Sequence, residues 1–433
     1  MSFPRYPKYK ASGVEWLGEV PEHWSRSALK RLADYENGFP YKPEDRGNSG
    51  RPIIRISQLT SDDPPACFEG SVEGHVPIED GDLLFSWSAS IDAFIWQRGP
   101  ALLNQHIFKV TPSEGVYKRF LFHLIRHVAP KLADFDAHGS TMRHIKKESL
   151  GEVTYLPPIA EQRAIAAFLD RETKKIDELV AEQERLIELL KEKRQAVISH
   201  AVTKGLDPAA PMKPSGVEWL GDVPAHWGVK LIKRLSPVLR GASPRPIDDP
   251  KYFDDEGEFA WVRIADVSAS DGELWSTPQR LSKLGSSLSV KLEQGSLFVS
   301  IAGTVGKPCI TRIKACIHDG FVYFPRLTIE AAWLYRIFAA GLCYGGLGKL
   351  GTQLNLNTDT IGGIHVPLPP VSERHAIVAF LDRATEKIDT LVAQAESAIA
   401  LLTERRSALI SAAVTGQIDV RNAVASANPT EAA

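Results

Sequence analysis

A long stretch of the sequence occurs twice, and this repeat constrains the fold more than any other feature. The first copy is residues 156–207, which read LPPIAEQRAIAAFLDRETKKIDELVAEQERLIELLKEKRQAVISHAVTKGLD. It returns 212 residues later, at 368–419, without a gap and with about three in five positions identical. A shorter segment, SGVEWLGEVPEHW at 12–24, returns as SGVEWLGDVPAHW at 215–227. Repeats at so long a period indicate a duplicated domain rather than a solenoid of small units.

Each copy of the long stretch predicts one continuous helix. Pro157 and Pro158 exclude helix before them, so the first helix should begin near Ile159. Apolar residues then recur at heptad spacing for more than four heptads, which is typical of a coiled coil. The predicted first row of the helix–helix seam is Leu169, Ile176, Gln183, Leu190 and Val197, with Leu381, Ile388, Ala395, Leu402 and Leu409 in the second copy. The predicted second row is Ile165, Leu179 and Leu186, with Ile377, Leu391 and Ala398.

A helix of this length needs a partner of equal length. About 45 residues at a rise of 1.5 Å give about 65 Å, which is longer than an ordinary domain. The other copy is the obvious partner, and if the pair is antiparallel, Gln183 would face Ala395 or Ala398 and fix the register. Gly205 is predicted to end the first helix. Gly416 is predicted to end the second helix, one residue before the position that corresponds to Gly205 in the repeat.

The composition excludes several classes of protein. The chain has 433 residues, a formal net charge of −2 and 24% charged residues, so it is not a strongly basic nucleic-acid coat and is long enough for two or more domains. The sequence has no uncharged run of 18 apolar residues, and MSFPRYPKYK at its start has no signal-peptide core, so a cytoplasmic protein without membrane contact is expected. The cysteines form no CxxC pair and predict no metal site; they are Cys67, Cys309, Cys316 and Cys343.

The repeats give the chain a cyclic order of segments. We predict a repeated segment at 1–24, a variable domain at 25–155, a helix at 156–207, a linker with the second repeated segment at 208–227, a variable domain at 228–367, a helix at 368–420 and a disordered tail at 421–433. In a pseudo-twofold molecule the last helix should lead back to the first segment, which places the chain ends near each other. Trp16, Trp24, Trp219 and Trp227 should anchor the repeated segments by packing.

The two variable domains share a plan but little sequence. Short strands are predicted at PIIRISQLT, GDLLFSWSAS, AFIWQ and NQHIFKV, followed by a helix from Val116 to about Ala133. In the second domain FAWVRIADV, GSLFVSIAGTVG and HDGFVYFPRL match three of these strands, and a helix follows around Ile329 to Ala340. Strands followed by a helix predict an α+β domain. Two binding domains of different specificity on one symmetric frame would give this pattern.

The polar loops of both domains carry side chains suited to base edges and phosphates. Arginine pairs with guanine, Asn or Gln with adenine, and hydroxyls or lysine with phosphate. The matched positions Gly139–Thr141 and Gly351–Gln353, 212 residues apart, would suit close backbone approach to a phosphate, or form a plain turn. The DNA-binding candidates of the first domain are Arg51, Arg55, Ser88, Asn104, Gln105, His106, Ser140, Thr141, Arg143, His144 and Lys146. Those of the second domain are Arg240, Ser243, Arg245, Arg263, Thr304, Lys307, His318, Thr352, Gln353, Asn355 and Asn357.

The sequence does not predict catalysis by this chain alone. A DNA methyltransferase would need a four-residue motif in which a polar residue and two prolines precede an aromatic residue that stacks on the flipped base. The near match Asp63–Ala66 ends in alanine, which cannot stack. The nuclease-like spacing in Glu172–Lys174 lies on the long helix and is lost in the second copy, which reads Ala384–Glu386. Residues 303–308, GTVGKP, have the wrong glycine spacing for a phosphate-binding loop. We therefore predict no catalytic residue, no cofactor and no metal in this chain.

The repeated LPPIAEQRAIAAFLDRETKKIDELV and LPPVSERHAIVAFLDRATEKIDTLV helices, with the two GVEWLG segments, resemble the specificity subunit of a type I restriction–modification system. The resemblance implies two target recognition domains, each reading one half of a bipartite asymmetric DNA site, with an antiparallel helix pair that sets the spacer. It also implies partners: double-stranded DNA, two methyltransferase subunits and restriction subunits, with S-adenosylmethionine, ATP and Mg expected on the partners. Subunit docking would fall on residues of the repeats, namely Trp16, Asp170, Arg171, Arg194, Trp219, Asp382, Arg383 and Arg406. The charged residues among them could equally form salt bridges within the helix pair.

A second hypothesis is a coiled-coil adaptor whose two domains bind proteins rather than DNA. Such a protein should expose aromatic and leucine patches on its domains, whereas a DNA reader should show salt-dependent binding through polar loops. The divergent polar loops favour DNA.

Overall fold

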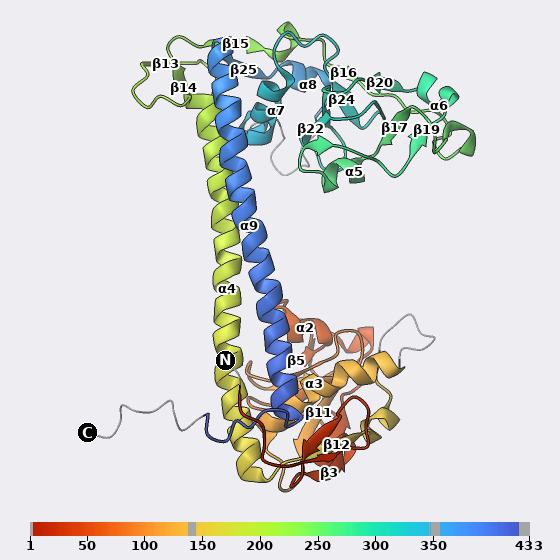
Figure 1. Cartoon of the computed structure of the whole chain (residues 1–433). Coiled ribbons are helices and arrows are strands. Elements are labelled where there is room, and N and C mark those ends of the chain that lie inside the picture. Colours follow the sequence, from red (N-terminus) through yellow and green to blue (C-terminus); the bar gives the residue numbers. More distant parts are fainter. Residues whose placement is uncertain (1–2, 137–143, 346, 348–355, 424–433) are drawn as a thin grey trace. The chain divides into compact units, whose positions relative to one another are not determined.

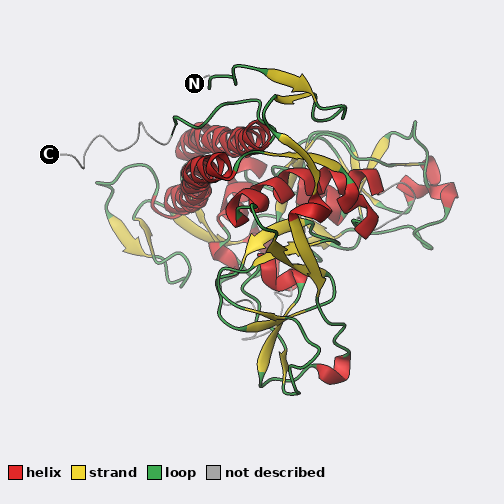
Figure 2. Cartoon of the chain, turned by 90° about the horizontal axis from the view of Figure 1, so that it is seen from below, coloured by secondary structure: helices red, strands yellow, loops and turns green. Residues whose placement is uncertain are grey.

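The computed structural model describes residues 3–136, 144–345, 347 and 356–423. The chain forms two compact units, each built from both helices and strands (Figure 2). The first unit comprises Met1–Glu184 with Ser397–Ala433, and the second comprises Arg185–Glu396. Each unit therefore contains one variable domain, one half of each long helix and one copy of the short repeated segment. This α+β organisation agrees with the fold class predicted from the duplication.

The two long repeats form the helices α4, Ile159–Lys204, and α9, Val371–Val414 (Figure 1). Helix α4 begins directly after Pro157 and Pro158, as predicted, because proline blocks earlier helical turns. Gly205 follows the last residue of α4 with φ of 76°, and Gly416 lies just beyond α9 with φ of 73°. Both glycines adopt the left-handed conformation that ends helices, as the sequence predicted.

The helices run antiparallel within each unit. In the first unit the start of α4 shares a core with the end of α9, through Ile165, Leu169, Ile410 and Val414. In the second unit the end of α4 packs with the start of α9, through Ile198, Val202, Ile377 and Leu381. The predicted antiparallel pairing is therefore confirmed in both units.

The second row of the predicted seam is wrong along most of the helices. Leu179, Leu186 and Leu391 are 45%, 42% and 41% exposed, although they were expected in the seam. The residues that accompany the first row lie four positions after it instead of four before it: Thr173, Val180, Ile187, Arg194 and Ala201, with Thr385, Val392, Ile399, Arg406 and Ala413. A second row four residues before the first and one four residues after it both satisfy a heptad spacing. The leucines made the row before the first look apolar, and this favoured the wrong choice. The true row contains threonine and arginine, which the hydrophobic pattern does not reveal.

Two threonines in the seam have local hydrogen-bond partners. The Thr173 hydroxyl donates to the Leu169 carbonyl at 2.7 Å, and Thr385 repeats this contact with Leu381 at 2.8 Å. Such bonds to the preceding turn remove the penalty of burying a hydroxyl group.

Two equivalent ion pairs connect the helices. In the first unit Arg406 Nε lies 3.0 Å from Asp177 Oδ1. In the second unit Arg194 Nε lies 2.9 Å from Asp389 Oδ1. The paired residues are related by the 212-residue repeat, so each unit carries the same contact with the helices exchanged. Gln183, the predicted register residue, is half-buried.

The described part of the first unit contains two four-stranded sheets and two two-stranded pairs. One sheet has the order β4 (Ala33–Asn37), β11 (Ile107–Pro112), β8 (Leu83–Ser86), β9 (Asp92–Ile95). The other has the order β6 (Cys67–Phe68), β5 (Arg51–Ile54), β10 (Ala101–Leu103), β7 (Pro77–Ile78). Strand β3 (Ser25–Ala28) pairs with β12 (Val153–Leu156), and β1 (Tyr9–Ala11) pairs with β2 (Glu19–Pro21). The helices are α1 (Leu29–Leu32), α2 (Ile56–Thr60) and α3 (Lys118–Asp136), with 3-10 turns at Pro43–Asp45 and Lys147–Gly151.

The second unit repeats this plan with a larger first sheet. That sheet has the order β16 (Leu239–Arg240), β24 (Phe321–Tyr323), β21 (Leu297–Ser300), β22 (Pro308–Thr311), β18 (Glu273–Leu274). The other has the order β19 (Arg280–Leu281), β17 (Phe259–Val262), β23 (Ala315–Ile317), β20 (Val290–Leu292). Strand β15 (Gly228–Leu231) pairs with β25 (His365–Leu368), and β13 (Met212–Pro214) with β14 (Asp222–Pro224). The helices are α5 (Ile264–Ala269), α6 (Lys283–Ser287), α7 (Ala331–Ala340) and α8 (Thr358–Gly362), with 3-10 turns at Ile232–Arg234, Pro250–Tyr252 and Leu342–Tyr344.

The segments PIIRISQLT and FAWVRIADV are only half strand, which corrects the prediction of continuous strands. Each strand ends before an arginine, Arg55 or Arg263, and a short helix follows. The side chain of the residue three positions on, Gln58 or Asp266, accepts the backbone N–H of that arginine at 3.3 or 2.8 Å. This cap stabilises the helix start. The sequence did not predict the helix, because the segment is rich in residues that favour strands.

The end of the chain returns to its beginning, as the cyclic order predicted. The Asp419 N–H donates to the Pro4 carbonyl at 2.8 Å, and the Tyr9 hydroxyl donates to the Gly416 carbonyl at 3.0 Å. The tail predicted for 421–433 is described only as far as Ala423. Residues 421–423 form a turn in which the Ala423 N–H donates to Val420, so the chain is folded further than predicted.

A glutamate near the start of each long helix binds the short repeated segment. Glu161 Oε1 accepts hydrogen bonds from Trp24 Nε1 at 2.8 Å and from the Tyr6 hydroxyl at 2.5 Å, and its Oε2 lies 2.8 Å from His23 Nε2. In the second unit Glu373 is bonded in the same way by the Trp227 indole at 3.0 Å and by His226 at 2.7 Å. Both tryptophans are fully buried, which confirms them as packing anchors.

An aspartate on each long helix binds the domain helix that lies beside it. Asp170 accepts from Arg119 Nε at 3.0 Å and from His123 Nε2 at 2.8 Å, both on α3. Asp382 is paired in the second unit with Arg336 of α7. Partial burial opposes the charge on Asp170, but the hydrogen bonds from His123 and Arg119 outweigh it and hold the pKa of Asp170 below its usual value.

The first unit should lose stability at mildly acidic pH because of histidines on α3. Burial, reinforced by nearby Lys131, lowers the pKa of His127 to about 4, and burial also lowers the pKa of His123. The neutral His127 ring accepts a hydrogen bond from Lys131 Nζ at 2.9 Å. Since the unfolded chain takes up these protons near pH 6.5 and the folded chain does not, stability falls as pH drops from about 6.5 to about 4, by about 3 kcal/mol for His127 alone.

Hydrogen exchange of α3 at pH 7.5 and pH 5 measures this effect. The His127→Gln variant keeps an acceptor for Lys131 but cannot titrate, so its α3 should lose less protection at pH 5 than the wild type. An equal loss in the two proteins would contradict the assignment. Helix α7 provides an internal comparison, since Arg336 replaces His123 as the partner of its aspartate.

Candidate nucleic-acid interface

Both domains contain a pair of parallel strands whose carboxyl ends carry candidate residues. In the first domain β5 pairs with β10, with Ile54 opposite Leu103. In the second domain β17 pairs with β23, with Val262 opposite Ile317. Because the strands of each pair end side by side, the residues that follow them lie together. Arg55 and Asn104 follow the first pair, whereas Arg263 and His318 follow the second.

The arginine is the same in both domains and the neighbouring residue differs. Arg55 and Arg263 precede α2 and α5, and both side chains are exposed. Asn104 is buried to 6% exposure, whereas His318 is half-buried. Burial, assisted by nearby arginines, lowers the pKa of His318. Its Nδ1 accepts the Gly320 N–H at 2.8 Å, which leaves Nε2 as the donor of the neutral ring.

A glycine in each domain lets a second segment cross these strand ends. A Cβ on Gly38 would lie 2.2 Å from the Asn104 carbonyl oxygen, and a Cβ on Gly241 would lie 2.2 Å from the His318 carbonyl oxygen. The Phe39 N–H donates to Leu103, and the Ala242 N–H donates to Ile317 at the equivalent place. Only glycine permits this approach, and it brings residues 37–42 and 240–245 to the two strand ends.

In the first domain several candidates meet around Trp87. The Trp87 ring lies 5.2 Å from that of His106, and the next residue, Ser88, forms a bridge with His144. Gln105 Nε2 lies 3.3 Å from His106 Nε2. The structure thus brings together Ser88, Gln105, His106 and His144, which come from three separate segments of the sequence. The Trp87 indole donates to Asn37 Oδ1 at 3.1 Å, which fixes its orientation.

Other first-domain candidates lie elsewhere or outside the described residues. Arg51 is exposed at the start of β5, at the opposite end of the strand from Arg55. Lys146 is exposed, and its backbone N–H donates to Asp136 at 3.0 Å. Ser140, Thr141 and Arg143 lie outside the described residues, as does the matched turn that contains Gly139.

In the second domain the candidates converge on Asp319, which the sequence analysis did not single out. Ser243 Oγ donates to Asp319 Oδ1 at 3.0 Å, and Arg245 Nη2 donates to Oδ2 at 3.2 Å. Arg240 Nε donates to the Asp319 backbone carbonyl. His318 Nδ1 lies 3.8 Å from Oδ1. The pairings of arginine, amides, hydroxyls and lysine with bases and phosphates give no signal for a carboxylate such as Asp319.

A pocket of about 590 Å³ opens beside this cluster. Its polar lining includes Arg263, His318 and Gln279, and Trp261 and Phe253 supply aromatic surface. The sequence did not predict Gln279 either, because its segment has little sequence similarity to the first domain. Amide, imidazole and guanidinium groups can hydrogen-bond to base edges.

The remaining second-domain candidates are separate from Asp319 or have local structural partners. Thr304 Oγ1 lies 2.5 Å from Ser268 Oγ, and Lys307 Nζ donates to the Ser268 carbonyl at 2.9 Å. Asn357 caps α8, accepting backbone N–H groups of Asp359 and Thr360 at 2.9 Å. Thr352, Gln353 and Asn355 lie outside the described residues, as does Gly351.

Most charged docking candidates have partners within the chain. Arg194 and Arg406 form the ion pairs between helices, and Asp170 and Asp382 bind the domain helices. Arg171 Nη2 donates to the Ala423 carbonyl at 3.2 Å. Arg383 is exposed, so it remains available on the helix surface. These contacts supply intramolecular roles, and docking on the same residues stays a prediction.

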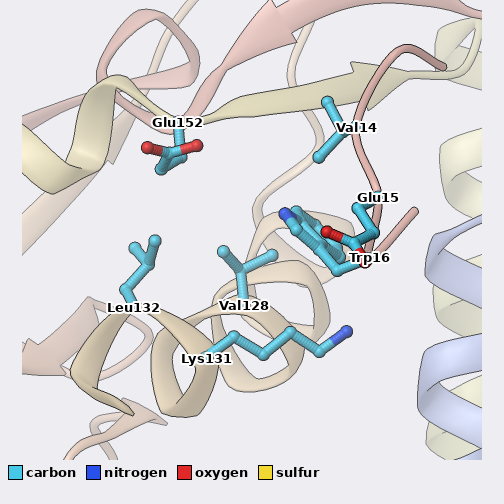
Figure 3. Close-up of a pocket in the computed structure, with 7 residues that line it drawn as sticks. All are labelled: Val14, Glu15, Trp16, Val128, Lys131, Leu132 and Glu152. Carbon is cyan, nitrogen blue, oxygen red and sulfur yellow. The ribbon is translucent and has the colours of Figure 1, made fainter. Parts of the chain in front are cut away.

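The tryptophan docking candidates lie partly exposed beside the two cores. Trp16 faces Val128 and Lys131 of α3 across a pocket of about 520 Å³ (Figure 3). Lys131 Nζ lies 4.4 Å from the centre of the Trp16 ring, a cation–π distance. Trp219 packs half-buried against the core of the second unit. Docking at these residues also stays a prediction.

Across the part of the chain that the structure describes, no cluster of potential metal ligands occurs. Burial raises the pKa of Cys309 and Cys316 to about 11 and that of Cys343 to about 12, so these thiols stay protonated. Among the described helices, none is both long and apolar enough to cross a membrane.

Comparison with known proteins gives consistent matches to one family. Residues 21–189 match the model of the type I restriction modification DNA specificity domain. The chain is 25% identical to the Type I restriction enzyme EcoBI specificity subunit of Escherichia coli, over 94% of this chain and 88% of that protein. It is 23% identical to the putative type I restriction enzyme MjaX specificity subunit of Methanocaldococcus jannaschii, over 94% and 96% of the two chains.

A solved structure shares the fold. The match has a TM-score of 0.70 at 18% identity and covers 91% of this chain and 98% of the other, in a study of complex assembly and conformational transition of the type I R-M system. The duplicated helices, the paired domains and these matches agree. Over nearly its whole length the chain is similar to specificity subunits of type I restriction–modification systems.

Proposed function

We propose that this chain selects the DNA sequence on which a type I restriction–modification complex acts, with each domain reading one half of a bipartite asymmetric site. The observation that carries the proposal is the pair of equivalent strand ends. Each domain places one exposed arginine there, Arg55 or Arg263, beside residues that differ, Asn104 or His318. A shared arginine with divergent neighbours suits two readers of different sequence on one frame.

In this proposal α4 and α9 hold the two domains and set the unread gap between the half-sites. The 46 residues of α4 correspond to about 69 Å at 1.5 Å per residue. With about 3.4 Å per base pair, that length is an upper limit on the spacing. The ion pairs of Arg194 and Arg406 support it, because they hold the helices in one register in each unit.

The proposal assigns catalysis to partner subunits. Two methyltransferase subunits and restriction subunits would bind this chain and carry S-adenosylmethionine, ATP and Mg, and the complex would act on double-stranded DNA in the cytoplasm. The net charge of −2 supports a need for partners, because a nearly neutral chain gains little from phosphate neutralisation.

Adenine methylation mapped at base resolution tests this function. Cells expressing the chain with its neighbouring methyltransferase should methylate a bipartite motif, and cells without the chain should not. Replacing residues 25–155 with the corresponding domain of a relative should change one half of the motif only. The other half and the spacer should stay the same, because α4, α9 and the second domain are retained.

Methylation that persists unchanged without the chain would contradict the proposal and favour the protein-binding adaptor. A swap that altered both halves would contradict independent reading by two domains. Salt-dependent DNA binding by the assembled complex separates the two hypotheses further, since an adaptor without DNA contacts has no such dependence.

A further inference from the structure

Asp319 is the centre of a cluster whose members come from two distant segments. Gly241 allows the segment after β16 to pass over the end of β23, where a Cβ would contact the His318 carbonyl oxygen. This crossing places Ser243 and Arg245 on the Asp319 carboxylate, at 3.0 and 3.2 Å. The cluster therefore depends on the tertiary structure, not on any local motif.

The backbone and the side chain of Arg245 are both held in place. The hydroxyl of the buried Tyr252 donates to the Arg245 carbonyl at 2.8 Å. The guanidinium is held on one edge by Asp319 Oδ2, and 68% of the Arg245 side chain is exposed. One guanidinium nitrogen is thus occupied, while most of the side chain stays exposed. Partial burial opposes the charge on Asp319, but Ser243 and the two arginines hold its pKa below the usual value.

An arginine held by a carboxylate is better suited to a base edge than to a phosphate. The neighbouring negative charge weakens attraction to phosphates, and a guanidinium restricted by that carboxylate favours a bidentate acceptor pair. Guanine offers such a pair in the major groove, through N7 and O6. Resting on the proposed function, we infer that Arg245 reads a guanine in the half-site of the second domain, and that Asp319 is the positioning residue that orients it.

The first domain has different residues at the positions equivalent to Arg245 and Asp319. Counting from the equivalent glycines Gly38 and Gly241, Lys42 stands where Arg245 stands in the second domain. Gln105 takes the place of Asp319, and its amide lies 3.3 Å from His106. The inferred guanine contact is therefore specific to the second domain, and the two half-sites should respond differently to the same change.

The test compares methylation by the assembled complex on duplexes that differ at one base pair. The domain swap first identifies which half-site belongs to the second domain. Asp319→Ala and Arg245→Ala should each reduce the preference for guanine over adenine at one position of that half-site, by roughly ten-fold or more. Asp319→Glu, which keeps the carboxylate, should retain more of the preference than Asp319→Asn. The first half-site should be unaffected.

Asp255→Ala is the matched control, because Asp255 is an exposed carboxylate of the same domain. It should leave both half-sites unchanged. If Asp319→Ala prevents assembly, Arg245→Ala decides, since its side chain is largely exposed. The inference is overturned if the second half-site contains no guanine, if Arg245→Ala keeps the preference, or if it slows methylation equally on all duplexes, as loss of a phosphate contact would. A wild-type complex that methylates no bipartite motif would instead overturn the proposed function.

Discussion

Replacing Glu161 by alanine should destabilise the first unit by about 4 kcal/mol, because it removes a buried charged acceptor and leaves its donors unpaired. Glu161 is 5% exposed, and Trp24 and Tyr6, which donate to it, are 1% and 4% exposed. Water cannot readily replace the lost carboxylate. Burial, followed by the bond to Glu161, raises the pKa of Tyr6 well above its ordinary value, so the hydroxyl stays a donor.

The second unit supplies the matched variant. Glu373 makes the same contacts with Trp227 and His226, but 29% of its side chain is exposed, and Ala209 stands in the second copy where Tyr6 stands in the first. Glu373→Ala should therefore cost less, about 1–2 kcal/mol. Urea unfolding gives the free energies, and hydrogen exchange of residues 3–24 and 212–227 locates the loss. Equal costs for the two variants would contradict the role given to burial.

Alanine at Gly38 or Gly241 should disable one domain and spare the other. In each case the new Cβ would lie 2.2 Å from a backbone carbonyl oxygen, so the crossing segment must move. Overpacking of this kind costs about 1–3 kcal/mol. The displacement should also reduce recognition of the corresponding half-site by roughly ten-fold or more, because base contacts depend on groups placed at the strand ends.

Methylation of duplexes altered in one half-site at a time measures this effect. Gly38→Ala should impair the half read by the first domain, and Gly241→Ala the half read by the second. Gly47→Ala and Gly228→Ala are the controls, since an added Cβ would meet its nearest neighbouring atoms at ordinary contact distances of 3.7 and 3.9 Å. Loss of both half-sites from either single variant, or of neither, would contradict the equivalence of the two crossings.

The sequence by itself determined the duplication and its consequences. Prolines at the start and glycines at the end set the limits of α4 and α9, because both residues restrict helical backbone locally. The repeat implied that the two long helices pair and that the chain end returns to its beginning, since equivalent segments in a pseudo-twofold molecule must have equivalent surroundings. The antiparallel direction of the pair was implied only by the family resemblance. The bond between Asp419 and Pro4 confirms that return.

Only the tertiary structure decided which side of each helix faces its partner. A heptad pattern allows a second row on either side of the first, and the exposed Leu179 and Leu186 showed that the apolar side was the wrong choice. It also decided how the recognition residues group. Asp319 gathers Ser243 and Arg245 through a crossing that depends on Gly241, and a contact between segments more than 70 residues apart in sequence leaves no periodic signal.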